Sequence, residues 1–252
     1  MITLLVSSAA ASEGSSVMSN FTSSQAFILI IIIAGLGWLV QMRLQSVFTK
    51  YSKVASPGNM SGVEAAEKML RENHIYNVKI THVSGHLTDH YNPATMTVNL
   101  SDSVYSSRSV AAVAVACHEC GHAIQHARGY AALQLRSRLV PIVSFSSKFA
   151  TLIIIGGLLL MAATNNEIVC WIGIGMIAMS ALFSIVTLPV EYNASDRALE
   201  WMRSSRIASE VELDAARTSL KWAARTYLVA ALSAVATVIY YITIIMGNRR
   251  SN

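Results

Sequence analysis

The chain has 252 residues, of which 53% are hydrophobic and only 13% are charged. Soluble domains carry about 25% charged residues, so this composition excludes a disordered chain and favours a protein that lies in lipid. Three cysteines are too few for a disulfide scaffold. The formal net charge is +5, but basic and aromatic residues do not interleave in a stripe. We therefore expect no nucleic-acid partner.

Four segments with almost no charge are long enough to cross a bilayer, which requires about 17–25 mainly apolar residues. We place the transmembrane helices at 26–42, 140–164, 168–190 and 226–247. The second contains Lys148, whose charged end can reach the membrane surface while its stem stays in lipid. The alternative is four buried helices of a soluble protein, and the lengths of these segments favour membrane spans over it.

The distribution of basic residues predicts the orientation. Of the 19 Lys and Arg residues, ten lie within 43–138 and six within 197–225. Two spans separate these segments, so both lie on one side, and the positive-inside rule places that side in the cytoplasm. We predict a multi-pass protein of the plasma (inner) membrane with both termini outside. The N-terminal tail, 1–25, lacks a basic region, so we expect no cleaved signal peptide; Met1 and Met18 both remain candidate starts.

The first cytoplasmic segment, 43–139, has the pattern of a small α+β domain. Ser61 and Glu64 form a capping box ahead of a helix that we expect to end near Asn73. Alternating apolar residues predict strands at 77–83 and 95–100. A longer helix is expected from about Ser109 to a stop at Gly129. The second cytoplasmic segment is 191–225.

The candidate metal-binding and catalytic residues lie on this longer helix. His118-Glu119-Cys120-Gly121-His122 fits the H-E-x-x-H pattern, which places two histidines one turn apart on the same face. Two imidazoles in that arrangement can bind one zinc ion. Glu119 flanks this site, where its carboxylate can accept a proton from the water that attacks a peptide carbonyl. A coincidental polar face on a surface helix is the alternative, and the very apolar stretch before His118 argues against it.

A catalytic zinc site needs a third protein ligand and one position for water. His126 lies two turns beyond His118 but is too far along the helix axis, so we expect it near the site or on the surface. Glu191 is the better candidate, because it directly follows the apolar segment 168–190, which Pro189 breaks near its end, and so lies at the cytoplasmic membrane face. The remaining candidates are the other carboxylates and the histidines His74, His82, His86 and His90.

The chain resembles the neutral zinc metallopeptidases of bacterial membranes, the YugP type. The resemblance rests on the blocks SGVEAAEKML, GHLTDHYNPATMTVNLSDSVY, SRSVAAVAVACHECGHAIQHARGYA, LRSRLVP and TLPVEYNASDRAL, which occur in family order and reach from about Tyr51 to Ala231. It implies one zinc ion per chain with His118, His122 and Glu191 as ligands, and Glu119 as the catalytic base.

A looser likeness connects the chain with membrane proteases of the heat-shock and prenyl-protein-processing type. These also place a transmembrane hairpin between H-E-x-x-H and the ligand glutamate, and an aspartate usually follows that glutamate by four residues. Here Ser195 occupies that position and Asp196 is its neighbour. The likeness therefore implies a supporting role beside the metal for one of these two residues.

A group that stabilises the developing oxyanion is also needed. The candidates are His90, in a loop that we expect between the two strands, together with Tyr192 and Arg197. A turn held by its own side chains is an equally good interpretation of the Asp89-His90-Tyr91 segment. The strand TMTVNL is a candidate edge for pairing with an extended substrate, although such a strand is more often simply part of a sheet.

We therefore predict a mainly α, multi-pass membrane protein with four transmembrane helices and a small cytoplasmic α+β zincin-like catalytic domain. A hairpin of two spans separates the H-E-x-x-H motif from the third ligand. The predicted function is zinc-dependent endopeptidase activity on peptides or on membrane or membrane-associated proteins. The alternatives are a non-catalytic, zinc-stabilised membrane scaffold and a protease that cuts within the bilayer. No oligomeric state is predicted.

Overall fold

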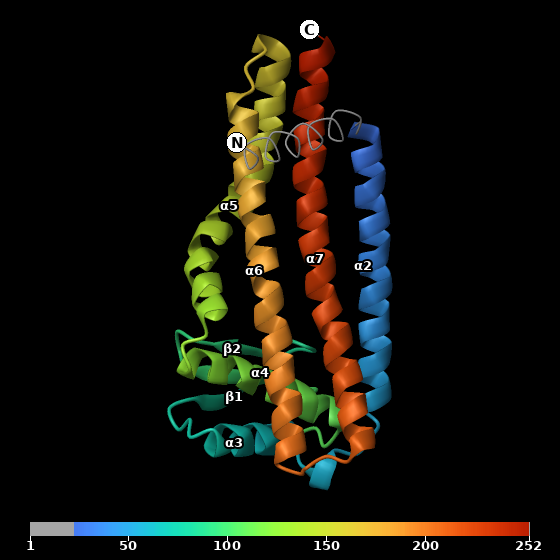
Figure 1. Cartoon of the computed structure of the whole chain (residues 1–252), viewed down its shortest axis with the longest axis vertical. Coiled ribbons are helices and arrows are strands. Elements are labelled where there is room, and N and C mark those ends of the chain that lie inside the picture. Colours follow the sequence, from blue (N-terminus) through green and yellow to red (C-terminus); the bar gives the residue numbers. More distant parts are fainter. Residues whose placement is uncertain (1–22, 252) are drawn as a thin grey trace, which may run out of the picture. The chain divides into compact units, whose positions relative to one another are not determined.

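The computed structural model describes residues 23–251, so most of the predicted N-terminal tail and both candidate starts lie outside the described residues. Six α-helices and three strands are present in this part of the chain (Figure 1). In chain order the elements are α2 (Ser23–Tyr51), the 3-10 helix η1 (Pro57–Asn59), α3 (Gly62–Glu72), β1 (Lys79–Val83), β2 (His90–Asn92), β3 (Thr97–Ser101), α4 (Val110–Ala127), α5 (Ala131–Thr164), α6 (Ile168–Ser204) and α7 (Glu210–Ser251).

Four of these helices, α2, α5, α6 and α7, are long and apolar enough to cross a membrane. The prediction of four such helices is therefore confirmed. All four extend beyond the predicted apolar segments: α2 ends at Tyr51, α5 starts at Ala131, α6 ends at Ser204 and α7 starts at Glu210. The helix α6 does not end at Pro189 but continues to Ser204, so its apolar part and Glu191 belong to one helix. A proline removes one backbone hydrogen bond, which a long, packed helix can tolerate.

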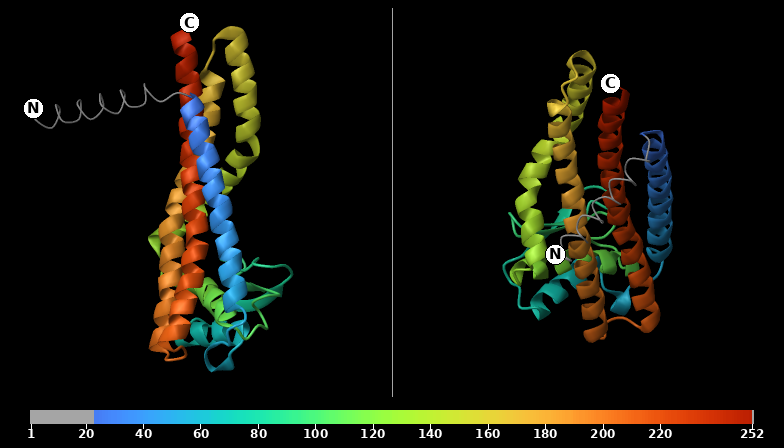
Figure 2. Two further views of the ribbon diagram at one scale, coloured as in Figure 1. Left: turned by 90° about the vertical axis from the view of Figure 1, so that its right-hand side faces the viewer. Right: turned by 45° about the horizontal axis from the view of Figure 1, so that its top comes forward.

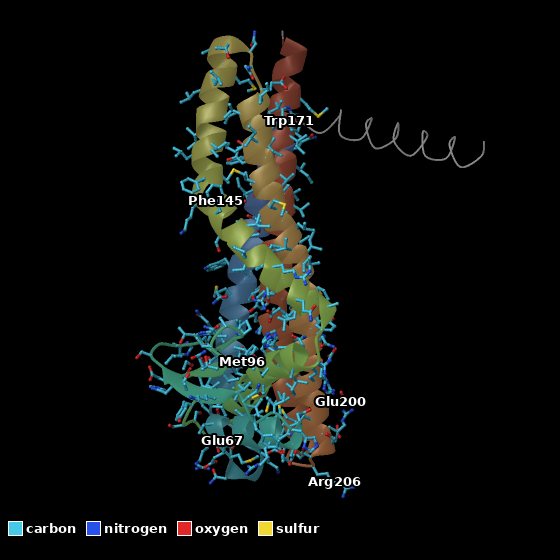
Figure 3. The ribbon with its side chains drawn as sticks, turned by 90° about the vertical axis from the view of Figure 1, so that its left-hand side faces the viewer. Glu67, Met96, Phe145, Trp171, Glu200 and Arg206 are labelled. Carbon is cyan, nitrogen blue, oxygen red and sulfur yellow. The ribbon has the colours of Figure 1, made fainter. Side chains whose placement is uncertain are left out.

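The chain divides into two compact units, and the first comprises the described parts of residues 1–36, 140–184 and 229–252. In it, α5 and α6 form a hairpin, with Asn165 in the turn at a φ of 56° (Figure 2). A Cβ atom on Gly157 would lie 2.7 Å from the backbone nitrogen of Cys170, so the two helices approach closely there. The exposed side chains of Phe145 and Trp171 belong to this unit (Figure 3).

The second unit comprises residues 37–139 and 185–228 and contains the three-stranded sheet, in the order β1-β3-β2. Strand β3 pairs in parallel with β1 and antiparallel with β2. The strand TMTVNL is thus central and offers no free edge to a substrate, so of the two interpretations the ordinary strand of a sheet is the one that holds. Strand β2 contains His90 and Tyr91, which we had expected in a loop. Three residues are too few to show the alternation by which strands are predicted.

The core of this unit is formed by α3 and α4, which pack against each other and against the sheet. Ser61 and Glu64 form the predicted capping box at the start of α3. The apolar first half of α4 is buried on nearly every side, including Val110, Val113 and Ala114. Gly129, with a φ of 64°, follows the end of α4, as predicted. This burial holds α4 in place and so positions the H-E-x-x-H motif in its second half.

Candidate metal centre

Two histidines of α4 and one glutamate of α6 converge in the second unit. One ligand atom from each of His118, His122 and Glu191 lies within 4.8 Å of the other two. The Oε2 atom of Glu191 is 3.2 Å from Nε2 of His118 and 3.4 Å from Nε2 of His122. The glutamate side chain is buried, and 73 residues separate it from His118 in the sequence. The structure thus brings together the three residues that we had predicted as ligands.

The second nitrogen of each imidazole is held by a neighbouring side chain. Nδ1 of His118 lies 3.1 Å from Oγ of Ser195, on the next turn of α6 after Glu191. Nδ1 of His122 lies 3.0 Å from Oε1 of Gln125. Such contacts orient a metal-binding histidine and fix which nitrogen faces the metal. Here both Nε2 atoms are directed at Glu191, and Ser195 occupies the supporting position that the sequence had suggested for it or Asp196.

Gln125 was missed by the sequence analysis. Its amide Nε2 donates to the carbonyl oxygen of Val190 at 2.8 Å and to Oδ1 of Asn193 at 3.0 Å. Because the amide nitrogen is used in this way, its oxygen accepts from Nδ1–H of His122, which leaves the Nε2 lone pair of that histidine free for a metal ion. Gln125 is completely buried and ties α4 to the turn of α6 that carries Glu191.

Arg136, from the start of α5, was also missed. One of its guanidinium nitrogens lies 3.5 Å from Oε1 of Glu191. The two carboxylate oxygens of Glu191 therefore have different partners: Arg136 faces Oε1, and the histidines face Oε2. In the sequence, an arginine beside an apolar segment indicates membrane topology, so nothing local indicated this contact.

The carboxylates of Glu191 and Glu119 also affect the pKa of His122. Burial by itself lowers the pKa of this imidazole, but the hydrogen bond and the charge of Glu191, together with the charge of Glu119, raise it above the usual value for histidine. The site is therefore arranged to stabilise positive charge between α4 and α6. A divalent cation would benefit from the same arrangement.

Two cysteines, one directly before the motif and one within it, do not belong to this cluster. Cys117 and Cys120 are fully buried in the core, and Sγ of Cys120 lies 3.7 Å from the carbonyl oxygen of Ala66 in α3. Burial raises the pKa of both thiols. They therefore stay protonated and pack as small apolar side chains in the core of this unit.

A cavity of about 180 Å³ opens beside the three ligand candidates. His118, Glu119 and Glu191 all line it, and Ser195 and Tyr227 do so too. The side chain of Glu119 is buried, with 8% of the residue exposed. The residue that we predicted as the base therefore faces the same space as two of the three ligand candidates, His118 and Glu191, where a substrate carbonyl could enter.

Five other predicted site residues do not line this cavity. Nδ1 of His126 lies 2.7 Å from the hydroxyl of Tyr91, and Nδ1 of His90 lies 2.9 Å from the carbonyl oxygen of Thr88. Nε of Arg197 donates to Oδ1 of Asn193 at 2.8 Å. The other two residues of this group are exposed on α6: Tyr192 and Asp196.

The glycine in the motif allows α4 and α6 to approach each other. A Cβ atom on Gly121 would lie only 2.5 Å from the carbonyl oxygen of Ala194 and 3.0 Å from its Cα. Both are backbone atoms, which cannot rotate away as the end of a side chain can. Gly121 therefore determines how near the helix of the two histidines lies to the helix of Glu191.

Replacement of Gly121 by alanine is expected to push α4 and α6 apart, because the added methyl group overlaps the backbone of Ala194. Overpacking of this kind costs about 1–3 kcal/mol. We expect a lower unfolding temperature in detergent and a zinc affinity at least about 10-fold weaker. Gly175→Ala, in the apolar part of α6, is the control, since a Cβ atom there meets nothing within 4 Å. Equal zinc affinity in the two variants would contradict this explanation of Gly121.

Residues 26–246 match the family described as "Putative neutral zinc metallopeptidase". The chain belongs to this family. It is also 40% identical over 229 residues to the "Putative membrane protease YugP" of Bacillus subtilis (strain 168), which covers 90% of this chain and 99% of that relative. The resemblance that we inferred from the sequence is thus confirmed. No solved structure matches the chain.

The family implies zinc, and the donor set of this site fits it. Two imidazole nitrogens and one carboxylate oxygen are a ligand set found in catalytic zinc sites, where a fourth position is left to water or substrate. The Nδ1 contacts of both histidines and the ion pair of Glu191 with Arg136 provide the outer contacts that such ligands require. The residues that would hold a zinc ion here are therefore His118, His122 and Glu191.

Proposed function

We propose that this protein is a zinc-dependent endopeptidase that cleaves membrane or membrane-associated proteins. In this proposal, His118, His122 and Glu191 bind one zinc ion per chain, and Glu119 is the general base. The observation that carries the proposal is the convergence of the three ligand candidates at a cavity that Glu119 also lines. A scaffold that used zinc only for stability would need no such base and would usually surround the metal with four protein ligands.

In the proposed reaction, each residue of the site has a separate role. When bound, zinc supplies Lewis-acid chemistry, which activates water for attack on a peptide carbonyl. The carboxylate of Glu119 accepts the proton of the attacking water and passes it to the departing amine. Ser195 and Gln125 keep the imidazoles turned towards Glu191, and Arg136 holds the outer oxygen of that carboxylate.

The experiment that tests this function uses the purified full-length protein in detergent. Zinc content and cleavage of casein or of a membrane protein are measured beside Glu119→Gln. We expect zinc to copurify with the protein, and cleavage to stop when a chelator removes the metal. Cleavage that persists after complete removal of zinc would overturn the proposal.

We further propose that the zincin-like catalytic part is cytoplasmic, formed by segments 43–139 and 191–225 at the surface of the inner membrane. The support is the concentration of basic residues in these segments, between four apolar helices. The ion pair of Arg136 with Glu191 is consistent with this, because it requires both segments on the same side of the membrane.

Reporter fusions test this topology. A reporter joined after Arg138 is expected to report the cytoplasm, and one joined after Asn252 the outside, because α5, α6 and α7 cross the membrane an odd number of times. A fusion after Asn166, in the turn between α5 and α6, is the control and is expected to agree with the Asn252 fusion. Identical signals from Arg138 and Asn252 would contradict the four-span arrangement.

A further inference from the structure

The cavity beside Glu119 is mainly apolar beyond the ligand residues. Helix α2 contributes Leu44 and Phe48, α4 contributes Val115, and α7 contributes Leu220 and Ala224. Phe48, Leu220 and Ala224 also belong to the buried set of residues in this unit, so these walls are fixed by packing. The apolar part of the cavity is continuous with the place where we propose that the peptide bond is cleaved.

Three acidic residues line the cavity, and each already has hydrogen-bond partners or a role in the proposed chemistry. No lysine or arginine is among the residues that line it. Asp89 also lines the cavity, and the two oxygens of its carboxylate accept hydrogen bonds from the backbone N–H and the hydroxyl of Ser101, at 2.7 and 2.9 Å. Glu119 and Glu191 have roles in the chemistry. An acidic substrate side chain would find no lysine or arginine in the cavity, and the carboxylate nearest to hand for a basic one is Asp89, which already accepts two hydrogen bonds from Ser101.

We propose that this cavity is the subsite for an apolar side chain of the substrate, at one of the two residues that flank the scissile bond. The inference rests on the proposed peptidase function and adds the class of sequence that is cleaved. A volume of about 180 Å³ is similar to the roughly 150 Å³ of an apolar cavity that binds benzene. The subsite therefore accepts side chains between those of valine and phenylalanine in size.

Two substitutions of lining residues, one on α7 and one on α4, change the size of the cavity in opposite directions. Ala224→Leu adds bulk from α7 and is expected to shift the preference towards alanine and valine. Val115→Ala removes two methyl groups from α4 and is expected to shift it towards phenylalanine and tryptophan. Ala230→Leu, exposed on the same helix as Ala224 and outside the cavity, is the control and is expected to keep the original preference.

The experiment measures cleavage of a peptide set in which each flanking position is varied in turn, with the zinc content of every variant determined. For the unaltered protein we expect leucine or phenylalanine to exceed aspartate and lysine by at least about 10-fold in kcat/KM at one of the two positions. Each cavity variant is expected to change the ratio of kcat/KM between peptides with small and with large apolar residues by about 10-fold.

The outcomes separate this inference from the function on which it rests. Cleavage with no apolar preference, with a preference for lysine or arginine, or with an even loss for all peptides in both cavity variants, would overturn the subsite while leaving the peptidase function intact. If the zinc-loaded, unaltered protein cleaves none of the peptides and no protein substrate, the proposed function fails, and the subsite fails with it.

Discussion

Replacement of Glu119 by glutamine is expected to leave zinc bound while reducing cleavage by at least about 100-fold, the low end of the contribution of a general base. Glutamine has nearly the same shape but cannot accept a proton at the working pH. The ligand candidates His118, His122 and Glu191 are unchanged in this variant, and Glu119 is not in their cluster. Zinc content by metal analysis and cleavage rates with zinc in excess are the two measurements.

Glu67→Gln is a matched control for this substitution. Glu67 lies exposed on α3 (Figure 3) and does not line the cavity, so the same chemical change there is expected to leave both zinc content and cleavage unaltered. Full activity of the Glu119→Gln variant would contradict the peptidase mechanism proposed here. Loss of zinc from that variant would instead make Glu119 a ligand or a structural support of the site.

Replacement of Glu191 by alanine is expected to weaken zinc binding by more than about 100-fold and to abolish cleavage at ordinary zinc concentrations. Removal of an outer contact of a metal ligand already costs 10–100-fold in affinity, and Glu191 also supplies the negative charge that the two imidazoles lack. The measurement is the zinc affinity by competition with a chelator, followed by cleavage over a range of zinc concentrations.

Three further variants accompany this prediction. In the Glu191→Ala variant, Arg136 loses its partner, and this loss could itself destabilise the fold. The Glu191→Gln variant preserves the volume of the side chain and so separates loss of the ligand charge from loss of folding. His126→Ala is expected to have a much smaller effect, since the structure pairs His126 with Tyr91 outside the cluster. Glu200 is exposed on α6, the helix of Glu191 (Figure 3), and Glu200→Ala is expected to have no effect on zinc affinity. Full zinc occupancy in Glu191→Ala together with loss in His126→Ala would refute the ligand assignment.

The sequence alone determined the features that depend on local spacing. The four apolar helices follow from the length of uncharged segments, and the ends of α3 and α4 follow from Ser61, Glu64 and Gly129. The pair His118 and His122 follows from the pitch of a helix, because residues four apart lie on one face. Strand β2 was missed because three residues carry no periodicity of their own.

Only the tertiary structure decided which distant groups meet at this site. Glu191 was predicted from its place after an apolar segment, but its contact with the histidines depends on the packing of α4 against α6 at Gly121. No local sequence pattern indicates a role for Gln125 or Arg136. Their contacts with the site form only because α4, α5 and α6 pack together, which places Gln125 beside His122 and Arg136 beside Glu191. Helix periodicity decides which side chains share a face, whereas the partner of each face is decided by packing between segments far apart in the chain.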